Sequence, residues 1–429
     1  MNDFTSTVEW LYGLQMFGMK LGLENTQALC KYFGNPQNKY PVIHIAGTNG
    51  KGSTSALIMS ILREAGLNVG LYTSPHLISF NERIRVNGEK ISEEQVVEYV
   101  RMLRPTVEKL KATFFEATTA IAFRYFAEKH VDVGVIETGL GGRLDSTNVV
   151  NPVLTVITSI GLEHTEQLGD TIEAITKEKA GIIKHRVPLV TGVKQESAMK
   201  IILDVAKRES APVTFSQFDM QMKLNEITSS EMRIDVQGNA HSLKNVTSPF
   251  VGVHQMDNIA TAVCAIEQAE NIFAHAVSDA VLAKGIEKTL IHSHLRCRFE
   301  TLWRDPVMIC DVAHNPSGFE RIMETLDVIG TRGCIWVLGV MKDKDYRKIL
   351  RLIRPKCSML FCVQPKTDRA LPSAELAISA QMLGIETIDA GSVAHGIEQA
   401  IGYAGKKKVF IAGSHYVAGE ALEYFGETV

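Results

Sequence analysis

Short apolar runs rich in β-branched residues alternate with stretches of helical length along most of this 429-residue chain. In the first half the runs are PVIHIAG, NVGLYTS, VDVGVIE, VLTVITSI and PLVTGV. This alternation predicts βαβ units and a mostly parallel sheet, because a parallel crossover needs a helix between its two strands. Residues 131–137 and 153–158 are apolar throughout, so we expect both strands at the centre of the sheet, covered on both faces.

The pattern of the chain changes twice, which indicates two domains in a chain too long for one ordinary core. Polar and apolar residues alternate over 219–247, which predicts a small antiparallel meander attached to the first domain. Helical spacing returns over 278–290. A second alternating series has strands expected at PVMICD, GCIWVLG, CSMLFCV and KKVFIAG, a helix from Pro316, and two helices before the last strand. We therefore expect an N-terminal domain over 1–294 and a smaller Rossmann-like α/β domain over 295–429.

Composition narrows the class of protein. The 45 basic and 48 acidic residues leave a net charge of −3, so nothing global favours nucleic acid. The N-terminus has no basic segment followed by an apolar run, and no stretch approaches ~18 apolar residues, so we expect neither export nor a membrane span. The seven cysteines are scattered without a CxxC pair, which favours reduced thiols over a zinc site. We expect a cytoplasmic monomer that acts on small molecules.

The stretch IHIAGTNGKGSTSAL departs from the standard phosphate-loop pattern, in which glycines lie five apart and a hydroxyl directly follows the lysine. Here Gly47 and Gly50 are three apart, and Gly52 separates Lys51 from Ser53. The context is nevertheless that of a P-loop, because a predicted strand ends just before the loop and a predicted helix begins near Ser53. The first domain is therefore expected to be of the P-loop type.

Backbone N–H groups of this loop and of the helix N-terminus would face nucleotide phosphates, and the lysine would carry charge to the outer ones. A glycine turn that binds nothing is the alternative, and it leaves a lysine between two glycines without a structural role. We predict that the nucleotide-binding residues are Gly47, Thr48, Asn49, Gly50, Lys51, Gly52, Ser53 and Thr54. Either Ser53 or Thr54 can present a hydroxyl to Mg²⁺.

Polar residues follow three of the predicted strands. Glu137 stands at the carboxyl end of a buried strand, where ligands of doubly wound sheets bind. A carboxylate there is costly unless a cation or a donor meets it. Ser74 and His164 follow two other strands and can reach the same crevice, so the three residues can hold one divalent ion. Taken singly, each has a structural alternative: a cap, a solvated rim charge, or a hydrogen-bonded core histidine.

The loop G-T-N-G-K-G-S resembles the ATP loop of the Mur ligase superfamily, and its glycine after the lysine is similar to the folylpolyglutamate synthase and dihydrofolate synthase branch. Further segments match that branch in order: TSPHL (73–77), NERIRVNG (81–88), ETGLGGRLDSTNV (137–149), IGLEHTEQLGDTI (160–172), EKAGIIK (178–184), HQMDN (254–258), DVAHNP (311–316) and GSHY (413–416). The resemblance thus extends from about residue 44 to residue 416.

The resemblance implies a metal centre and a modified lysine. It assigns Ser74, Glu137 and His164 to a second Mg²⁺, beside the ion at Ser53, so two ions are expected. Lys179 by composition is one more solvated helix lysine, but the lysine at this position of the family is typically carbamylated. Carbamylation requires the neutral amine, which burial or a cationic neighbour favours.

Residues of both predicted domains are implied around the nucleotide. Asn258 matches the position that contacts adenine, and Arg298 would reach the phosphates from the domain junction. Asp311 would face the ribose and His314 the incoming glutamate, so both act only if the domains close. Two departures stand out: Arg296-Cys297-Arg298 replaces the usual Pro-Gly-Arg, and His415 replaces Leu or Phe in the terminal motif, where Ser414 is assigned to the amino-acid side.

The implied reaction is ATP-dependent addition of L-glutamate to folates, through an acyl phosphate. GGRLDSTN resembles the bacterial enzymes that act on both dihydropteroate and folates, with Asp145 and Ser146 at the pterin, so we expect both activities. Phe115 and Glu116 are further candidates on the pterin side. Catalytic roles fall to Lys51, His164 (as a ligand), Lys179, Asp311 and His314.

Four alternatives are weighed against this function. A folylpolyglutamate synthase without the second activity remains open. A peptidoglycan Mur ligase is disfavoured, because only 46 residues precede Gly47, too few for a separate nucleotide-sugar domain. A nucleotide-gated protein without catalysis is disfavoured, because Lys51, Glu137, His164 and Asp311 are all present. A Rossmann oxidoreductase is excluded, because no G-x-G-x-x-G follows the first strand.

Overall fold

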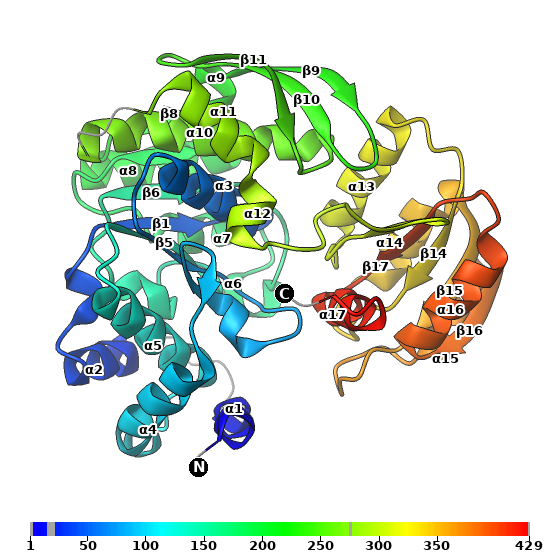
Figure 1. Ribbon diagram of the computed structural model, residues 1–429, viewed down its shortest axis with the longest axis horizontal. Coiled ribbons are helices and arrows are strands. Elements are labelled where there is room, and N and C mark those ends of the chain that lie inside the picture. Colours follow the sequence, from blue (N-terminus) through cyan, green and yellow to red (C-terminus); the bar gives the residue numbers. More distant parts are fainter. Residues whose placement is uncertain (1–2, 15–21, 274–276, 428–429) are drawn as a thin grey trace.

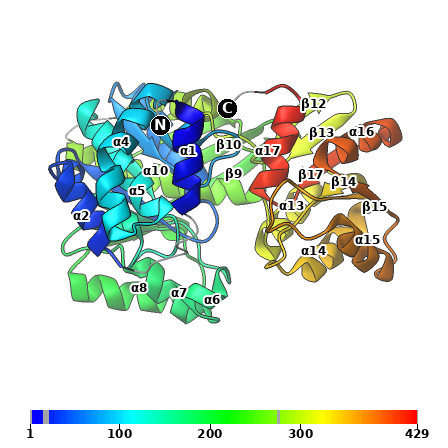
Figure 2. The same ribbon diagram turned by 90° about the horizontal axis from the view of Figure 1, so that it is seen from below.

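The computed structural model describes residues 3–14, 22–273 and 277–427. Two α/β units lie side by side, the first drawn in blue to green and the second in yellow to red (Figure 1). The last helix, α17 (His415–Tyr424), lies at the boundary between the units in both views (Figures 1 and 2). A Cβ on its Gly419 would come within 2.3 Å of the carbonyl oxygen of Leu77, so this helix packs closely on the first unit.

The first unit is built on an eight-stranded, mostly parallel sheet. Its strands are β1 (Val42–Ala46), β2 (Val69–Tyr72), β3 (Ile84–Val86), β4 (Glu89–Lys90), β5 (Val133–Glu137), β6 (Leu154–Ile157), β7 (Leu189–Thr191) and β8 (Val213–Phe215). The order is β4-β3-β2-β5-β1-β6-β7-β8, with only β3 and β4 antiparallel to their neighbours. The strands β5 and β6 thus flank β1 at the centre, as their apolar sequences predict.

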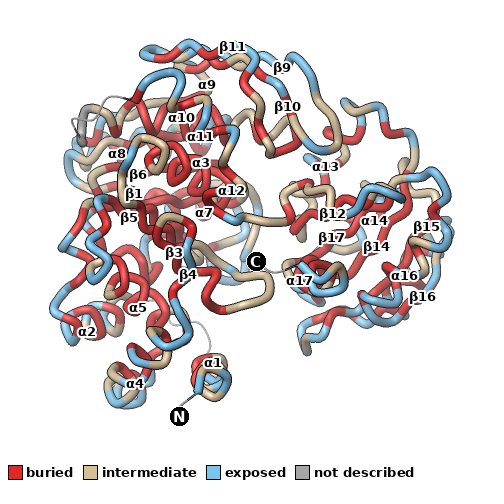
Figure 3. The backbone as a smooth tube through the Cα atoms, in the orientation of Figure 1, coloured by how far each residue is buried: buried red, intermediate tan, exposed pale blue. Residues whose placement is uncertain are grey.

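Helices cover both faces of this sheet. They are α1 (Phe4–Gly13), α2 (Glu24–Tyr32), α3 (Lys51–Glu64), α4 (Glu93–Leu110), α5 (Phe114–Glu128), α6 (Thr165–Leu168), α7 (Ile172–Ala180), α8 (Glu196–Glu209), α9 (Ser216–Asp219), α10 (Val253–Phe273), α11 (Asp279–Glu287) and α12 (Thr289–Ser293). Because side chains alternate along a strand, Ile43 and Ile45 of β1 pack with α3 and α10, whereas Val42 packs with α2, α4 and α5. Figure 3 shows the central strands as buried chain.

A three-stranded antiparallel sheet lies over α10 and α11 at the top of Figure 1. It is formed by β9 (Gln221–Ile227), β10 (Met232–Gln237) and β11 (Ser242–Ser248) in the order β11-β10-β9. Met232, Ile234 and Val236 of the middle strand enter the same core as α3 and α10. The meander therefore belongs to the first unit, as its alternating sequence predicts.

The second unit contains a six-stranded sheet. Its elements are β12 (Glu300–Arg304), β13 (Val307–Cys310), α13 (Pro316–Val328), β14 (Cys334–Leu338), α14 (Tyr346–Ile353), β15 (Cys357–Val363), α15 (Ser373–Met382), β16 (Thr387–Gly391), α16 (Val393–Ala404), β17 (Val409–Ala412) and α17. The order is β12-β13-β17-β14-β15-β16, and only β12 is antiparallel to its neighbour. One face packs on α13, α14 and α15, and the other on α16 and α17.

The predicted fold class is confirmed: a mostly parallel first unit with an antiparallel appendage, and a second α/β unit. The helix after the phosphate loop, α3, begins at Lys51, two residues before the predicted start near Ser53, because Gly50 adopts the left-handed conformation and ends the loop there. Residues 278–290 form two helices, with Lys288 as the residue between them. The edge strands β12 and β16 were not predicted, because each pairs on one side only and carries few buried residues. The boundary at 294/295 stays a prediction.

Within the described ranges, no helix combines the length and the apolar character needed to cross a membrane.

Candidate functional site: a phosphate loop facing the second unit

The phosphate loop joins the central strand β1 to α3, and its glycines are required by geometry. Gly47 has φ +154 and Gly50 has φ +86, conformations that side chains disfavour. A Cβ on Gly47 would lie 1.9 Å from Thr158 Oγ1, and one on Gly50 would lie 2.2 Å from Asn258 Oδ1. The N-terminus of α3 therefore starts immediately after a tight loop, which is the arrangement that binds phosphate.

Side chains of neighbouring segments fix this loop. Thr48 Oγ1 donates to the Gly161 carbonyl (3.1 Å) and accepts from the Gly161 N–H (3.0 Å). Ser159 Oγ accepts from the Asn49 N–H (3.1 Å) and donates to the Asn49 carbonyl (2.9 Å). The loop is thus tied to the chain leaving β6, which leads to His164.

Two lysines converge on one carbonyl of the loop. Lys51 Nζ donates to the Gly47 carbonyl (3.1 Å) and the Thr48 carbonyl (3.2 Å). Lys179 Nζ, from α7, donates to the same Gly47 carbonyl (2.7 Å) and is only 4% exposed. Burial, followed by the positive charge of Lys51, lowers the pKa of Lys179 to about 7, although Glu163 acts in the opposite direction. A large fraction of this amine is therefore neutral near pH 7.

Glu137 lies at the end of β5, as predicted, and is buried. Its Oε2 accepts a hydrogen bond from the Ser74 N–H (3.3 Å). Burial raises the pKa of Glu137, while the charges of Lys51 and Arg298 act to lower it. A desolvated carboxylate facing cations suits a site for a divalent ion, and the buried Thr54 Oγ1 nearby on α3 has no partner in the described chain.

In the part of the chain that the structure describes, His164 has no direct polar contact with the other two predicted metal ligands. It is exposed at the start of α6 with φ +51, and no hydrogen bond or ion pair joins it to Glu137 or Ser74 among the described residues. The described ranges also hold no group of three His, Cys, Asp or Glu side chains placed to bind a metal. The predicted set has only two such side chains, Glu137 and His164, so hydroxyl and phosphate oxygens would have to complete it.

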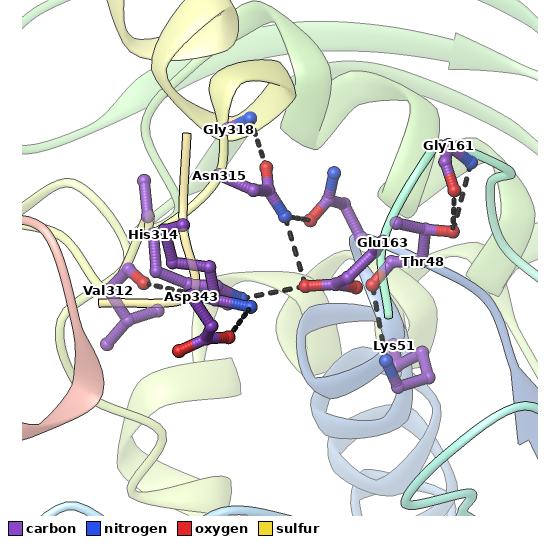
Figure 4. Close-up of polar contacts among 12 residues, drawn as sticks. Thr48, Lys51, Gly161, Glu163, Val312, His314, Asn315, Gly318 and Asp343 are labelled. Atoms are coloured by element: carbon purple, nitrogen blue, oxygen red, sulfur yellow. Dashed lines mark hydrogen bonds and ion pairs between the residues drawn. The ribbon is translucent and has the colours of Figure 1, made fainter. Parts of the chain in front are cut away.

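The residue before it, Glu163, is a site residue that sequence reasoning missed. Its Oε1 lies 2.8 Å from His314 Nε2 and accepts from Asn315 Nδ2 (3.2 Å), both from the second unit (Figure 4). His314 Nδ1 lies 3.0 Å from the Val312 carbonyl, so both ring nitrogens face oxygen atoms that can accept a hydrogen bond. Burial raises the pKa of Glu163, but the hydrogen bond and charge of His314 prevail and hold it well below its usual range. The signal in the sequence that could have identified Glu163 as a site residue is its position directly before the predicted metal ligand His164.

The linker between the units contributes Arg298. A Cβ on Gly52 would lie 3.5 Å from Arg298 Nη2 and 3.8 Å from Glu137 Oε2, so the arginine reaches the start of α3. Asp311 is buried, and its two oxygens accept from the N–H groups of Phe299 (2.8 Å) and Ala313 (2.7 Å). Burial raises the pKa of Asp311, and Arg298 opposes this shift. The predicted nucleotide residues of the two units therefore do lie on facing sides.

Asp145, predicted at the pterin, organises its own loop. Its Oδ2 accepts from the Leu140 N–H (2.7 Å), and its Oδ1 accepts from the N–H (3.0 Å) and the hydroxyl (2.5 Å) of Thr147. That hydroxyl also lies 2.8 Å from Nε2 of the buried His44 on β1. Burial raises the pKa of Asp145, and these donors counteract the shift. The loop after β5 is thus anchored to the strand that carries the phosphate loop.

The remaining substrate candidates have structural contacts of their own. The Phe115 ring packs on Tyr72 (centroids 6.0 Å apart), and Ser146 is buried in the short 3₁₀ helix Ser146–Val149. Glu116 forms a capping box with Thr113, and Ser414 Oγ accepts from the Val417 N–H (3.1 Å) as the cap of α17. Substrate roles for these four residues stay predictions.

Comparison with known proteins decides the family. The family model described as Mur ligase middle domain matches residues 45–266, and the one described as Mur ligase, glutamate ligase domain matches residues 297–415. A Bacillus subtilis protein named dihydrofolate synthase/folylpolyglutamate synthase is 42% identical over 354 residues, 80% of each chain. The chain belongs to the folylpolyglutamate synthase/dihydrofolate synthase family of Mur ligases. It is therefore related to ATP-dependent ligases and not to Rossmann oxidoreductases.

Solved structures of this family have the same fold. A Mycobacterium tuberculosis folylpolyglutamate synthase complexed with ADP superimposes with a TM-score of 0.89 at 29% identity, covering 99% of this chain and all of the other. Escherichia coli FolC in complex with DHPP and ADP gives a TM-score of 0.86 at 28% identity, covering 98% and 97%. These Mur ligase relatives match along almost the whole length, which extends the likeness through both units and the linker.

Proposed function

We propose that this chain is an ATP-dependent ligase that adds L-glutamate to folates and also to dihydropteroate. The observation that carries the proposal is the phosphate loop with Lys51 at the start of α3, with Arg298 of the linker beside it and Asn315 of the second unit in contact with Asn49 of the loop. The names of the relatives support both activities, since the Bacillus subtilis protein is named for the two and the Escherichia coli protein holds DHPP with ADP.

The reaction proceeds in two displacements. A carboxylate oxygen of the folate attacks the γ-phosphorus of ATP, and the bond from that phosphorus to the ADP oxygen breaks. The glutamate amine then attacks the carbonyl carbon of the acyl phosphate, phosphate leaves, and the nitrogen gives up a proton. Lys51 stabilises charge on the transferring phosphoryl group, so catalysis is mainly positioning and electrostatics.

The remaining roles follow the predicted assignments. Asn258 contacts adenine, Arg298 the phosphates, Asp311 the ribose and His314 the incoming glutamate. Asp145, Ser146, Phe115 and Glu116 line the pterin side, and Ser414 the amino-acid side. We further propose that the protein works in the cytoplasm as a monomer on these small molecules, without nucleic acid or membrane partners.

Two Mg²⁺ ions would be held by Ser53 with the nucleotide, and by Ser74, Glu137 and His164. When bound, such ions neutralise charge on the phosphates and on the attacking carboxylate. The chain's own contribution is the buried carboxylate of Glu137, kept free of a salt bridge among the described residues and within reach of the field of Lys51.

Lys179 is proposed to become a carbamate. Its neutral Nζ adds to CO₂ and loses one proton, which converts a buried amine into an anion beside the metal residues. The low pKa of the amine, about 7, supports this step because the neutral form is the nucleophile.

The test is phosphate release by the purified protein with ATP, Mg²⁺ and L-glutamate, offering dihydropteroate, tetrahydrofolate and a muramyl-peptide acceptor in parallel. We expect release with both pterins. Release with tetrahydrofolate alone would leave a folylpolyglutamate synthase without the second activity, and release with the muramyl acceptor alone would contradict the proposal. The Lys51→Ala variant should keep its fold by circular dichroism and lose nearly all release, whereas full activity in that variant would remove the role given to the loop.

A further inference from the structure

A small cavity lies where the linker meets both units. It is lined from the first unit by α3, by β2 and the segment after it, by β3 and by the end of α12; from the linker by residues 294–296 and Arg298; and from the second unit by His415. Its accessible volume is about 30 Å³. Since one water position needs roughly 10–15 Å³, the cavity has room for about two such positions, the size of the two oxygens of a carboxylate.

Positive charge dominates the wall of this linker cavity. Arg85, Arg296 and Arg298 line it, together with the imidazoles of His294 and His415, in which burial lowers the pKa and so favours the neutral ring. Arg296 is neutralised by Glu300 (2.7 Å) and Glu427 (3.2 Å). Neither Arg85 nor Arg298 has an ion pair with any carboxylate of the described chain. The charge of Arg298 acts on the nearby carboxylates of Glu137 and Asp311, which leaves Arg85 as the guanidinium of the wall to explain.

The one acidic residue in the wall is already engaged elsewhere. Glu82 accepts from the N–H groups of Leu77 (2.7 Å), Ile78 (2.8 Å) and Ser79 (2.5 Å), so it holds the turn before β3. Its carboxylate forms no ion pair with Arg85 in the described chain. These three donors hold the Glu82 carboxylate in the turn, so its charge acts on Arg85 only from a distance and fills no hydrogen-bonding position of the guanidinium.

Arg85 is the most constrained of the cations. It is only 4% exposed, on β3, and its Nη1 donates to the Gly88 carbonyl (2.9 Å). Its Nη2 is buried and has no hydrogen-bond partner among the described residues. Because a buried N–H donor without an acceptor is costly, the Nη2 group of Arg85 is suited to receive an anionic oxygen from outside the chain.

The linker cavity adjoins the reaction site. Gly52 belongs to its wall, and a Cβ there would lie 3.8 Å from Glu137 Oε2. Thr73 and Pro75, on either side of Ser74, also line it. A substrate bound between the units can therefore place one carboxylate in the cavity while its reacting group stays near the phosphate loop.

We propose that the linker cavity is a carboxylate-binding subsite in which Arg85 receives one carboxylate of a substrate. The assignment to a substrate rests on the proposed ligase function. Two sources share this chemistry: a carboxylate of free L-glutamate, and a carboxylate on the glutamyl chain of the folate. The free Nη2 group of Arg85 and the small volume favour a single carboxylate over a larger anion.

The kinetic test compares Arg85→Met, which keeps the length of the side chain and removes its charge, with Arg85→Lys, which keeps the charge. Loss of a charged hydrogen bond should raise one KM about 10- to 100-fold, with a smaller effect on kcat. A rise for L-glutamate alone assigns the subsite to the amino acid, and a rise for tetrahydrofolate alone assigns it to the folate chain. The lysine variant should recover part of the loss, and Arg208→Met, at an exposed position on α8, should change neither KM.

Unchanged KM values in Arg85→Met would overturn the proposal. So would a loss of kcat and of thermal stability with both KM values intact, because that result describes a structural arginine.

A binding measurement tests the cavity independently of enzyme activity. Without ATP, glutarate should raise the melting temperature of the wild type and not that of Arg85→Met, even if the wild type forms no amide and the proposed function fails. Stabilisation by chloride alone, with no effect of glutarate, would show an inorganic anion site and overturn the proposal.

Discussion

At the scale of single residues, Lys179 and Lys51 show how one carbonyl can organise two cations. Both donate to Gly47, but Lys179 is buried while Lys51 is partly exposed. Burial, together with the neighbouring charge of Lys51, lowers the pKa of Lys179 to about 7. The two lysines are therefore suited to different chemistry: Lys51 supplies a positive charge for phosphate, and Lys179 supplies a partly neutral amine that can react.

We predict that Lys179→Met abolishes amide formation without loss of stability at pH 7. The pKa of Lys179 falls from the ordinary value of 10.5 to about 7 on folding, so the unfolded chain binds the extra proton between these values. The lysine therefore opposes folding at pH 7, and this penalty fades as the pH rises towards 10.5. Thermal melts between pH 6 and pH 10 should show a steeper gain of stability with pH in the wild type than in the variant.

Lys177→Met, at an exposed position on the same helix, is the matched control and should resemble the wild type in both activity and pH dependence. Activity should also follow the neutral fraction of Lys179, which rises from about a tenth at pH 6 to about nine-tenths at pH 8 for a pKa near 7. Added bicarbonate should raise the activity of the wild type at the lower pH. An active Lys179→Met enzyme would contradict the assigned role.

At the scale of elements, the path of the loop between β1 and α3 is fixed by several neighbouring segments. The loop between them has two glycines with positive φ, and hydrogen bonds to the chain after β6 fix its path. Asn258 of α10 fills the space beside Gly50, and its Nδ2 donates to Gln255 (2.7 Å). Three elements thus hold the N-terminus of α3 where phosphate would bind.

Gly50→Ala should weaken nucleotide binding and lower the stability of the fold. The φ of +86 costs an alanine about 1–2 kcal/mol, and its Cβ would also lie 2.2 Å from Asn258 Oδ1. Calorimetric binding of an ATP analogue and a thermal melt would measure the two effects. Gly402→Ala in α16 is the control, since nothing lies within 4 Å of its Cβ position and helical alanine is favoured there. Wild-type affinity in Gly50→Ala would show that the loop geometry is not needed for the nucleotide.

At the scale of the whole molecule, polar and apolar contacts join the units: Thr301 Oγ1 donates to the Ser229 carbonyl (2.8 Å), and Val251 packs into the core of the second unit. Glu163 of the first unit meets His314 and Asn315 of the second, and α17 packs so closely on Leu77 that only glycine fits at position 419. Each unit also has a sheet with a buried core of its own, so a change in the relative position of the units would rearrange the contacts between them and leave the two sheets intact.

We predict that an ATP analogue and a folate together draw the units closer. Nucleotide contacts are assigned to both units, so binding both substrates favours the closed arrangement. Small-angle scattering should show a smaller radius of gyration with both ligands than without. Glu163→Ala, which removes the bridge to His314, should enlarge the radius of the ligand-free protein, whereas Glu166→Ala, at a nearby position in α6, should not. An identical scattering profile with and without ligands would count against closure.

The sequence by itself determined the layered α/β fold and the phosphate loop. The spacing of apolar residues and of glycines is a local signal in the sequence. The uninterrupted apolar residues of β5 and β6 predict that both strands are buried. The edge strands β12 and β16 escaped prediction because pairing on one side leaves only a weak pattern. Family resemblance, and not the pattern of residues, supplied the roles of Lys179, Asp145 and His314.

Only the tertiary structure decided which side chains meet. Glu163 and His314 stand 151 residues apart, and no local pattern links them. The burial that lowers the pKa of Lys179 and isolates Arg85 depends on the packing of several elements at once. Electrostatic environment is a property of the assembled core, since it depends on every neighbour within a few ångströms, whereas strand and helix follow from each segment alone.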